Sequence, residues 1–315
     1  MHPILTITLN PALDIATSVG HVEPGVKLRC SAPQIDPGGG GINVARAIHQ
    51  LGGGVRAFVA LGGDTGERLE RMLRDGGLDP VVHPAPGETR QSLAVTDLGL
   101  NDQFRFMLPG PVWAPADIDA AAAAIVAVAP SDGFVVLSGS GPSGAQPDLY
   151  ARLCADLRAT GTKVIVDTSG PALAYLARGQ DAHPLVLRMD QEEAEGLALR
   201  ALPRRADSAA FAADLVARGA AEIVIVARGA EGSVLVTRDM QVHVVAAKVQ
   251  VVSKVGAGDT FVGAFTRALA MDLPLEEALA HGSAAASAAV MTEGTELCRA
   301  EDFEALLPQC IVAPI

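Results

Sequence analysis

Short apolar runs alternate with stretches of helical spacing along most of the chain. The first apolar run, residues 3–9, predicts a strand, and residues 41–52 carry apolar side chains at helical spacing before a glycine. A second strand is predicted at 55–61. Asp64, with Glu67 three residues later, then indicates the capped start of another helix.

The same alternation continues toward the C-terminus. Further strands are predicted at 133–137, 163–167, 185–187, 222–227, 233–237 and 242–246, and further helices at 115–129, 147–160, 190–197, 207–218, 257–271 and 275–291. Strands that alternate with helices are typical of an α/β fold, in which a mostly parallel sheet is covered by helices on both faces. The pattern therefore predicts a three-layer core.

Two segments break this rhythm. Residues 13–36 show no clear helix, and residues 88–108 have the pattern of a hairpin with a GLND turn at 99–102. Together they predict a small antiparallel sheet that projects from the core. The expected organisation is therefore a core made of residues 1–12, 37–87 and 109–315, and a projecting sheet made of residues 13–36 and 88–108.

Composition and charge narrow the function classes. Of 315 residues, 49% are hydrophobic, which supplies a core and excludes a disordered chain. The net charge is −12 and no Lys/Arg run occurs, which argues against a nucleic-acid partner. The first residues do not follow the pattern of a signal peptide, and no run of 18 apolar residues occurs. We therefore expect a cytoplasmic protein without a membrane partner.

The cysteines indicate no zinc or dithiol chemistry. The four cysteines are widely spread and no CxxC pair occurs. In a cytoplasmic protein such isolated cysteines are usually reduced, buried thiols. We therefore expect them to belong to the core and not to a redox site.

A run of four glycines precedes the first predicted helix. Gly38 to Gly41 would let the backbone approach a ligand closely and point its amide groups at it. Asn43 follows in the first turn and could hydrogen-bond a hydroxyl. The same run is also typical of a flexible turn, and its spacing does not fit the G-x-G-x-x-G dinucleotide-binding pattern.

A second glycine motif opens the predicted helix at 257–271. Gly256, Ala257 and Gly258 place free amides at a helix N-terminus, which favours an anion, and Asp259 lies in the same turn. A carboxylate beside such amides can accept a proton from a hydroxyl while the amides hold developing negative charge. The alternative is that Asp259 only complements the helix dipole. No P-loop sequence occurs, so phosphoryl chemistry here would need another device.

These motifs resemble those of the ribokinase-like (PfkB) carbohydrate kinases, and within that family the branch that phosphorylates fructose 6-phosphate. The resemblance covers essentially the whole chain. It rests on the glycine motifs at 38–41 and 256–259, about 220 residues apart and in the family's order, and on PGGGGINVARA at 37–47, TRQ at 89–91 and SGS at 138–140.

The resemblance implies a ribokinase-like core with a small β-sheet lid, and transfer of the γ-phosphoryl group of MgATP to a sugar hydroxyl. It implies that Asp259 is the base and that the amides of Gly256, Ala257 and Gly258 form the anion hole. The groups expected to hold the sugar are Asp14, Gly39, Gly40, Asn43 and Ser140. Outside the resemblance, Asp14, Asn43 and Ser140 would be read as turn or cap residues.

Three arginines in the predicted lid bear on whether the sugar already carries a phosphate. Arg90 and Arg105 lie on the two strands of the predicted hairpin, and Arg29 lies in the other lid segment. Guanidinium groups supply the forked donors that a phosphate needs, although an isolated surface arginine is more often solvated. Lids pair between subunits in related kinases, so a homodimer through the lid is expected and Arg29 could serve either site.

The nucleotide side departs from the family pattern. Where the family usually has Lys-Pro-Asn-x-x-Glu, this chain has Arg188, Asp190 and Glu193 at the three key positions. Asp190 and Glu193 could hold hydrated Mg²⁺, or they could simply form an acidic helix start. Further nucleotide contacts implied by the resemblance are Ala227, Gly229, Gly232, Ser253 and Ser287.

The function expected from the resemblance is an ATP-dependent kinase that converts fructose 6-phosphate to fructose 1,6-bisphosphate, with Mg²⁺ as cofactor and K⁺ left open. Kinases of fructose 1-phosphate or tagatose 6-phosphate remain alternatives. So does a non-catalytic sugar- or nucleotide-binding protein, because of the altered stretch at 188–193. The lid arginines disfavour a nucleoside kinase.

Overall fold

The predicted alternation forms a ten-stranded sheet with helices on both faces. A computed structural model describes residues 1–179, 183–294 and 296–315. The core strands are β1 (Ile4–Thr8), β4 (Arg56–Leu61), β5 (Pro80–Pro84), β8 (Phe134–Ser138), β9 (Lys163–Asp167), β10 (Val186–Asp190), β11 (Ile223–Ala227), β12 (Ser233–Val236), β13 (Gln241–Val244) and β14 (Val312–Pro314). The helices are α1 (Gly40–Gln50), α2 (Gly63–Asp75), α3 (Pro115–Val128), α4 (Leu149–Ala159), α5 (Gly170–Leu176), α6 (Gln191–Ala198), α7 (Arg205–Ala217), α8 (Ala257–Ala270), α9 (Leu275–Ala289) and α10 (Ala300–Leu306).

The sheet is parallel where the strand–helix alternation is regular and antiparallel at one edge. Its strand order is β14-β13-β12-β11-β10-β9-β8-β1-β4-β5, and the pairs from β5 to β11 are parallel. The strands from β11 to β14 follow one another as antiparallel neighbours. In the parallel part, every strand points its carboxyl end to the same edge of the sheet, where ligand sites form in open α/β folds.

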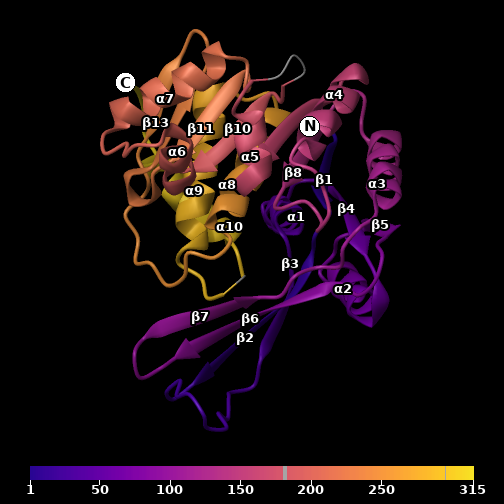
Figure 1. Ribbon diagram of the computed structural model, residues 1–315. Helices are drawn as coiled ribbons and strands as arrows, with labels where there is room; N and C mark the ends of the chain where they lie inside the picture. The colour runs from indigo at the N-terminus through magenta and orange to yellow at the C-terminus, as the bar shows by residue number, and fades with distance from the viewer. Residues whose placement is uncertain (180–182, 295) are drawn as a thin grey trace.

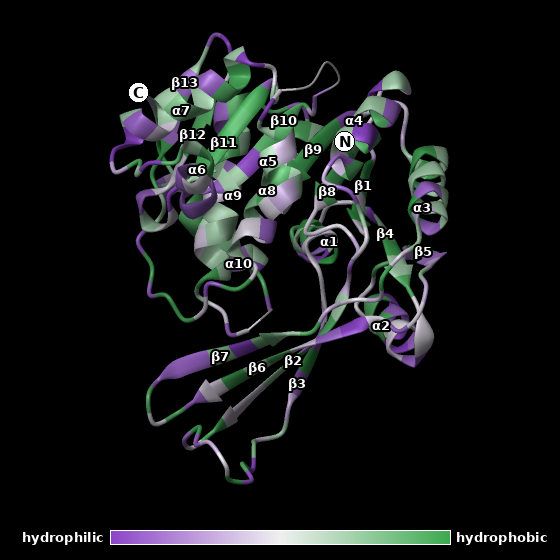
Figure 2. Ribbon diagram, viewed as in Figure 1, coloured by the Kyte–Doolittle hydropathy of each residue, from purple (hydrophilic) through white to green (hydrophobic). Residues whose placement is uncertain are grey.

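Side chains alternate between two apolar layers, one on each side of the sheet. One layer joins the strands to α3, α4, α5, α6 and α7, and the other joins them to α1, α8, α9 and α10. A smaller cluster seals α2 against β4 and α1. Figure 2 shows the central strands as a hydrophobic band between these helices. The α/β fold expected from the sequence is confirmed.

The two segments that break the alternation build a separate four-stranded sheet, the lid, which projects from the core (Figure 1). Its strands are β2 (Ala12–Val19), β3 (Gln34–Gly38), β6 (Arg90–Asp97) and β7 (Asp102–Met107), in the order β3-β2-β6-β7. The pairs β2–β3 and β6–β7 are antiparallel, as expected. The pair β2–β6, which joins the two chain segments, is parallel.

The predicted cap at Asp64 is wrong. Helix α2 begins at Gly63 after the N-cap Gly62, so Asp64 lies inside the first turn and its side chain caps nothing. Instead Glu88, from the chain that enters the lid, accepts a hydrogen bond from the Thr65 backbone N–H at 2.6 Å. A carboxylate from elsewhere in the sequence thus takes the place of the local cap.

Several short elements are absent from the predicted pattern. Strand β5 is an edge strand flanked by prolines, α5 and α10 have seven residues each, and β14 has three. Segments this short carry too few periods to register as an amphipathic pattern. Of the four free cysteines three are buried, as expected, but Cys30 is exposed in the lid. In the described part of the chain, no helix combines the length and apolarity that crossing a membrane needs.

Candidate active site

Three polar residues line up across neighbouring strands at the carboxyl edge of the sheet. Ser138 ends β8, Asp167 ends β9 and Arg188 lies near the end of β10, and the strand register pairs Ser138 with Asp167 and Asp167 with Arg188. Because side chains alternate along a strand, all three share the sheet face that α1 and α8 cover. The sequence analysis did not select Ser138 or Asp167 as site residues. Each one ends a buried apolar run, and Ser138 also opens the SGS motif at 138–140; these were the available signals.

Asp259 lies opposite this row, in the first turn of α8. The helix begins after Gly256, whose φ of 74° is in the left-handed region that glycine adopts easily. The Asn43 amide donates a hydrogen bond of 2.9 Å to Asp259 Oδ2, and the Ser138 hydroxyl donates one of 3.4 Å to Oδ1. Side chains from α1, β8 and α8 therefore converge on one carboxyl group.

The surroundings of Asp259 raise the pKa of its carboxyl group toward neutral pH. Burial raises the pKa of Asp259 to about 7 from an ordinary value of 3.8, and the negative charge of Asp167 adds to the rise. The hydrogen bond from Asn43 and the charge of Arg188 partly offset it. A carboxylate with a pKa near the operating pH has the proton affinity that general-base catalysis needs.

The glycine run before α1 brings backbone close to this carboxyl group. Gly39 is the N-cap of α1, with a φ of 123° that a side chain would strain. A Cβ on Gly40 would lie 2.7 Å from the Gly139 nitrogen, which means that the two loops touch. Asn43 is 6% exposed, and its Oδ1 has no partner within the described residues. The Asn43 side-chain oxygen is thus a buried acceptor whose hydrogen bond is unmet in the described part of the chain.

A second polar cluster forms where the lid leaves the core. Asp14 on β2 lies against the backbone of Gly38 and forms a hydrogen bond with Ser92 of β6. Burial raises the pKa of Asp14, while the positive charges of Arg90 and Arg105 act to lower it. Both arginines are therefore close enough to influence the same carboxylate, and the lid brings together two of the three arginines that the sequence singled out.

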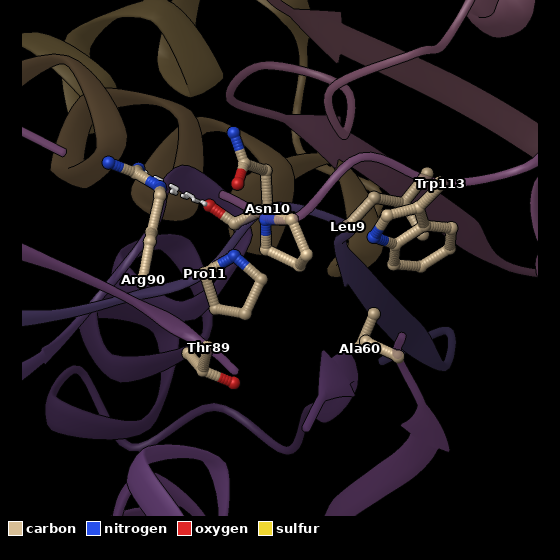
Figure 3. A pocket seen from close by; sticks show the side chains of 9 residues that line it. Leu9, Asn10, Pro11, Ala60, Thr89, Arg90 and Trp113 are labelled. Carbon is tan, nitrogen blue, oxygen red and sulfur yellow. Dashed lines mark hydrogen bonds between the residues drawn. The ribbon is translucent and has the colours of Figure 1, made fainter. Parts of the chain in front are cut away.

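Arg90 is one of the residues that line a small cleft between the lid and the core (Figure 3). Its Nε and Nη2 both donate to the Asn10 carbonyl oxygen at 3.3 Å, and no hydrogen bond joins its Nη1 to a residue that the structure describes. The Asn10 side chain donates to the Ser140 hydroxyl at 3.1 Å, which ties the loop after β8 to the loop after β1. Ser140 itself is exposed.

Arg29 is not part of this cluster within the chain. It is exposed in the loop between β2 and β3, and no hydrogen bond or ion pair joins it to a described residue. Arg105 is also exposed; its strand β7 pairs with β6 at Ala94, and its positive charge acts to lower the pKa of Asp14. Of the three arginines singled out in the sequence, Arg90 and Arg105 both act on the charge of Asp14 within one protomer.

Asp190 and Glu193 form a capping box at the start of α6. The Asp190 Oδ1 accepts from the Glu193 N–H, and the Glu193 Oε2 accepts from the Asp190 N–H, both at 2.9 Å. Arg188 does not pair with Asp190; its Nη1 donates to Asp167 Oδ1 at 3.1 Å. Each carboxylate of the box keeps one oxygen outside it. Burial raises the pKa of Glu193, and the negative charge of Asp190 adds to the rise.

The remaining residues predicted to contact the nucleotide lie at the end of β11, in the turn that follows it, in the loop before α8, and on α9. Ala227 ends β11, and Gly229 opens a 3-10 turn with free space around its Cα. Gly232 has a φ of 96° and packs against the Val244 carbonyl, which gives it a structural role. Ser253 accepts from the Val255 N–H at 3.2 Å, whereas the buried Ser287 donates to Ser283 O of its own helix at 2.8 Å. The Ser287 hydroxyl is therefore already hydrogen-bonded within its own helix.

Comparison with known proteins gives one family over nearly the whole chain. Residues 8–302 match the model of the pfkB family carbohydrate kinases. The ATP-dependent 6-phosphofructokinase isozyme 2 of Mycobacterium tuberculosis (strain CDC 1551 / Oshkosh) is 39% identical over 96% of this chain and 88% of its own length. A 1-phosphofructokinase of Xanthomonas campestris pv. campestris is 33% identical over 85% of this chain and 84% of its own. The crystal structure of phosphofructokinase-2 from Escherichia coli in complex with fructose-6-phosphate superposes with a TM-score of 0.90 at 36% identity, covering 98% of this chain and 99% of that one.

Proposed function

We propose that this chain, which belongs to the pfkB family of carbohydrate kinases, transfers the γ-phosphoryl group of ATP to O1 of fructose 6-phosphate. The observation that carries the proposal is that the glycine run touches both clusters, since Asp14 lies against Gly38 and Ser138 lies against Gly40. One holds a carboxylate with a pKa near 7 beside free helix amides. The other holds two arginines beside Asp14, where a phosphate on the sugar would be recognised.

Each residue of the site has its own role in the reaction. Asp259 takes the proton of the acceptor hydroxyl as that oxygen attacks phosphorus, and the bond from phosphorus to the ADP oxygen breaks. The amides of Gly256, Ala257 and Gly258 and the guanidinium of Arg188 stabilise the charge that develops on the phosphoryl oxygens. Asn43 holds Asp259 with a side-chain N–H, and its unpaired side-chain oxygen accepts a hydrogen bond from a sugar hydroxyl. Asp14 holds a further hydroxyl.

Asp190 and Glu193, at the start of α6, would suit a divalent metal that accompanies the nucleotide. Asp190 is exposed, and Asp190 and Glu193 each have one carboxylate oxygen outside the capping box. Hard oxygen donors of this kind suit Mg²⁺, which keeps several waters and takes few protein ligands. Among the described residues no group of three or more acidic, histidine or cysteine side chains forms a self-sufficient cage. Bound there, Mg²⁺ would neutralise phosphate charge.

Substitution Asp190→Asn tests this metal role. Asparagine caps a helix as well as aspartate, so α6 should remain intact while one negative charge disappears. An exposed charge at contact distance is worth about 1 kcal/mol, so the Mg²⁺ concentration for half-maximal activity should rise about fivefold. Asp117→Asn, which removes a comparable capping carboxylate from α3, is the control. An unchanged Mg²⁺ titration for Asp190→Asn would leave Asp190 with its capping role alone.

The pH dependence of kcat/KM should report Asp259 in the free enzyme. Only the ionised carboxylate can accept a proton, so activity should rise with pH and level off above a pKa of about 7. Below that pKa the expected slope is about tenfold per pH unit. The residual activity of Asp259→Asn should be flat over the same range. A wild-type profile that is flat from pH 5.5 to 7 would contradict the assignment.

A second candidate function is phosphorylation of fructose 1-phosphate, because the chain is also 33% identical to a 1-phosphofructokinase. A coupled ADP-release assay across fructose 6-phosphate, fructose 1-phosphate, tagatose 6-phosphate, fructose and nucleosides separates the candidates. The highest kcat/KM is expected with fructose 6-phosphate. Substituting Na⁺ for K⁺ in the same assay decides the monovalent-cation requirement. ATP binding without ADP release on any sugar phosphate would make the chain a non-catalytic binding protein.

The lid also supports a homodimer. All six residues of β7 are exposed, and Phe104 and Phe106 lie on the face opposite to that of Arg105 because side chains alternate along the strand. An exposed apolar strand face is typical of a protein interface, and a second copy would cover it symmetrically. Light scattering should give a dimer for the native chain and a monomer for Phe106→Glu. A monomeric native chain would overturn this assembly.

A further inference from the structure

Arg188 is enclosed by the protein but nearly unsatisfied. Its side chain is 13% exposed, and within the described residues it makes one hydrogen bond, from Nη1 to Asp167 Oδ1. Its Nε is buried without a partner. A guanidinium carries five N–H donors, and burying donors without hydrogen-bond partners costs free energy. Such a group is arranged to meet an anion.

The position of the guanidinium identifies which anion it meets. A Cβ placed on Gly258 would lie 3.0 Å from Arg188 Nη1 and 3.2 Å from Nη2, so the guanidinium packs against the turn that carries Asp259. The acceptor hydroxyl must lie beside Asp259 for its proton to be taken. The phosphoryl group in transfer therefore has to pass within reach of Arg188.

Asp167 is the group that fixes the guanidinium there. It lies beside Arg188 in the register of β9 and β10, and its side chain is 12% exposed. The other acidic groups nearby are engaged elsewhere: Asp190 and Glu193 bond to each other's backbone, and Asp259 bonds to Asn43 and Ser138. Asp167 is thus the one carboxylate that hydrogen-bonds Arg188 among the described residues.

We propose that Asp167 is a positioning residue, which holds Nη1 of Arg188 so that the remaining donors of the guanidinium face the transferring phosphoryl group. The proposal rests on the proposed phosphoryl transfer at this site. An arginine side chain has four rotatable bonds, and fixing its planar fork before the reaction removes an ordering cost from the transition state. The ion pair with Asp167 also offsets the free-energy cost of burying the Arg188 charge before an anion binds.

A double-mutant cycle on kcat tests the proposal. Asp167→Asn keeps the shape of the side chain, and it should lower kcat about tenfold while the KM for the sugar phosphate changes less than about twofold. Arg188→Met should lower kcat by at least as much. If Asp167 acts through Arg188, adding Asp167→Asn to Arg188→Met should change kcat less than about twofold. Independent, multiplicative losses, or an altered Mg²⁺ titration with Asp167→Asn in both backgrounds, would overturn the proposal.

A binding measurement gives a readout that does not depend on turnover. Calorimetry with ADP and with a non-hydrolysable ATP analogue should show that the native chain prefers the triphosphate and that Asp167→Asn loses most of this preference without losing ADP affinity. An unchanged preference would overturn the proposal. A native chain that prefers the triphosphate but phosphorylates no sugar phosphate would instead overturn the proposed function. If Asp167→Asn does not fold, Arg188→Lys keeps the charge but loses the fork, and it should lose the same preference; full retention would again contradict the proposal.

Discussion

Replacing Asp259 by asparagine is expected to lower kcat by roughly 10²–10⁴-fold, the usual contribution of a general base. The asparagine amide cannot take the proton of the acceptor hydroxyl, yet it fills the same space in the first turn of α8. Its carbonyl oxygen can still accept the hydrogen bond that Asn43 donates to Oδ2. Substrate binding and thermal stability should therefore remain close to those of the native chain, and steady-state kinetics beside a melting curve measure both.

The control for this variant is Asp119→Asn. Asp119 is an exposed residue of α3 whose salt bridge with Arg152 is of the kind that contributes about 0–1 kcal/mol. It should leave kcat and the melting temperature unchanged. Turnover of Asp259→Asn within about threefold of the native value would remove Asp259 from the mechanism, because a base that contributes so little is not the proton acceptor.

Arg90→Ala should weaken binding of the sugar phosphate by about 1.5–3 kcal/mol, or roughly 10- to 150-fold in Kd. Arg90 is half-buried at the root of the lid, close enough to influence the ionisation of Asp14. A hydrogen bond between charged groups in such a site is stronger than one at the open surface. Calorimetric titration with fructose 6-phosphate measures the loss.

The same titration with unphosphorylated fructose distinguishes recognition from lid structure. Arg90 also donates to the Asn10 carbonyl, so its removal could loosen the junction between β6 and the loop after β1. If Arg90 binds the phosphate, the affinity for fructose should hardly change. Equal losses for both ligands would show that Arg90 acts on the lid. Arg74→Ala, which removes an exposed arginine of α2, is the matched control and should affect neither ligand.

The sequence predicts the core of the fold well because long segments repeat their pattern. Strands β1, β4, β8, β9 and β11 are near-continuous apolar runs, and buried parallel strands read in this way. The parallel pairing of β2 with β6 could not be predicted from the sequence. Each residue of β2 pairs with one 78 positions later, as Leu13 does with Gln91, and β3, α1, β4, α2 and β5 lie between the two strands. Pairing of this kind depends on tertiary packing.

The start of α2 shows the same limit at the level of a single bond. Asp64 and Glu67 have the spacing of a local capping box, but the helix begins one residue before Asp64 and takes its carboxylate from Glu88. Local spacing predicts which residues can cap a helix. It does not show whether a residue from a distant part of the sequence, such as Glu88, takes that place instead.

The glycine motifs of the candidate site could be predicted from the sequence, whereas the ion pair between Asp167 and Arg188 could not. Asn43 and Asp259 lie in the first turns of glycine-led helices, and the structure joins them by a 2.9 Å hydrogen bond. Asp167 carries no motif of its own. Its importance follows from the strand order, which sets β9 beside β10 and hence Asp167 beside Arg188. The sequence shows that Arg188 stands where the family usually has lysine, but it does not show that Asp167 is the partner of Arg188.

The most direct test of phosphoryl transfer with Asp259 as the base is the identity of the product. Native protein incubated with MgATP and fructose 6-phosphate is followed by ³¹P NMR, beside the Asp259→Asn variant. The account predicts that the signals of ADP and fructose 1,6-bisphosphate grow together with native protein and fall by at least about 10²-fold in rate with the variant. ADP and inorganic phosphate without a bisphosphate, or equal bisphosphate formation by both proteins, would contradict it.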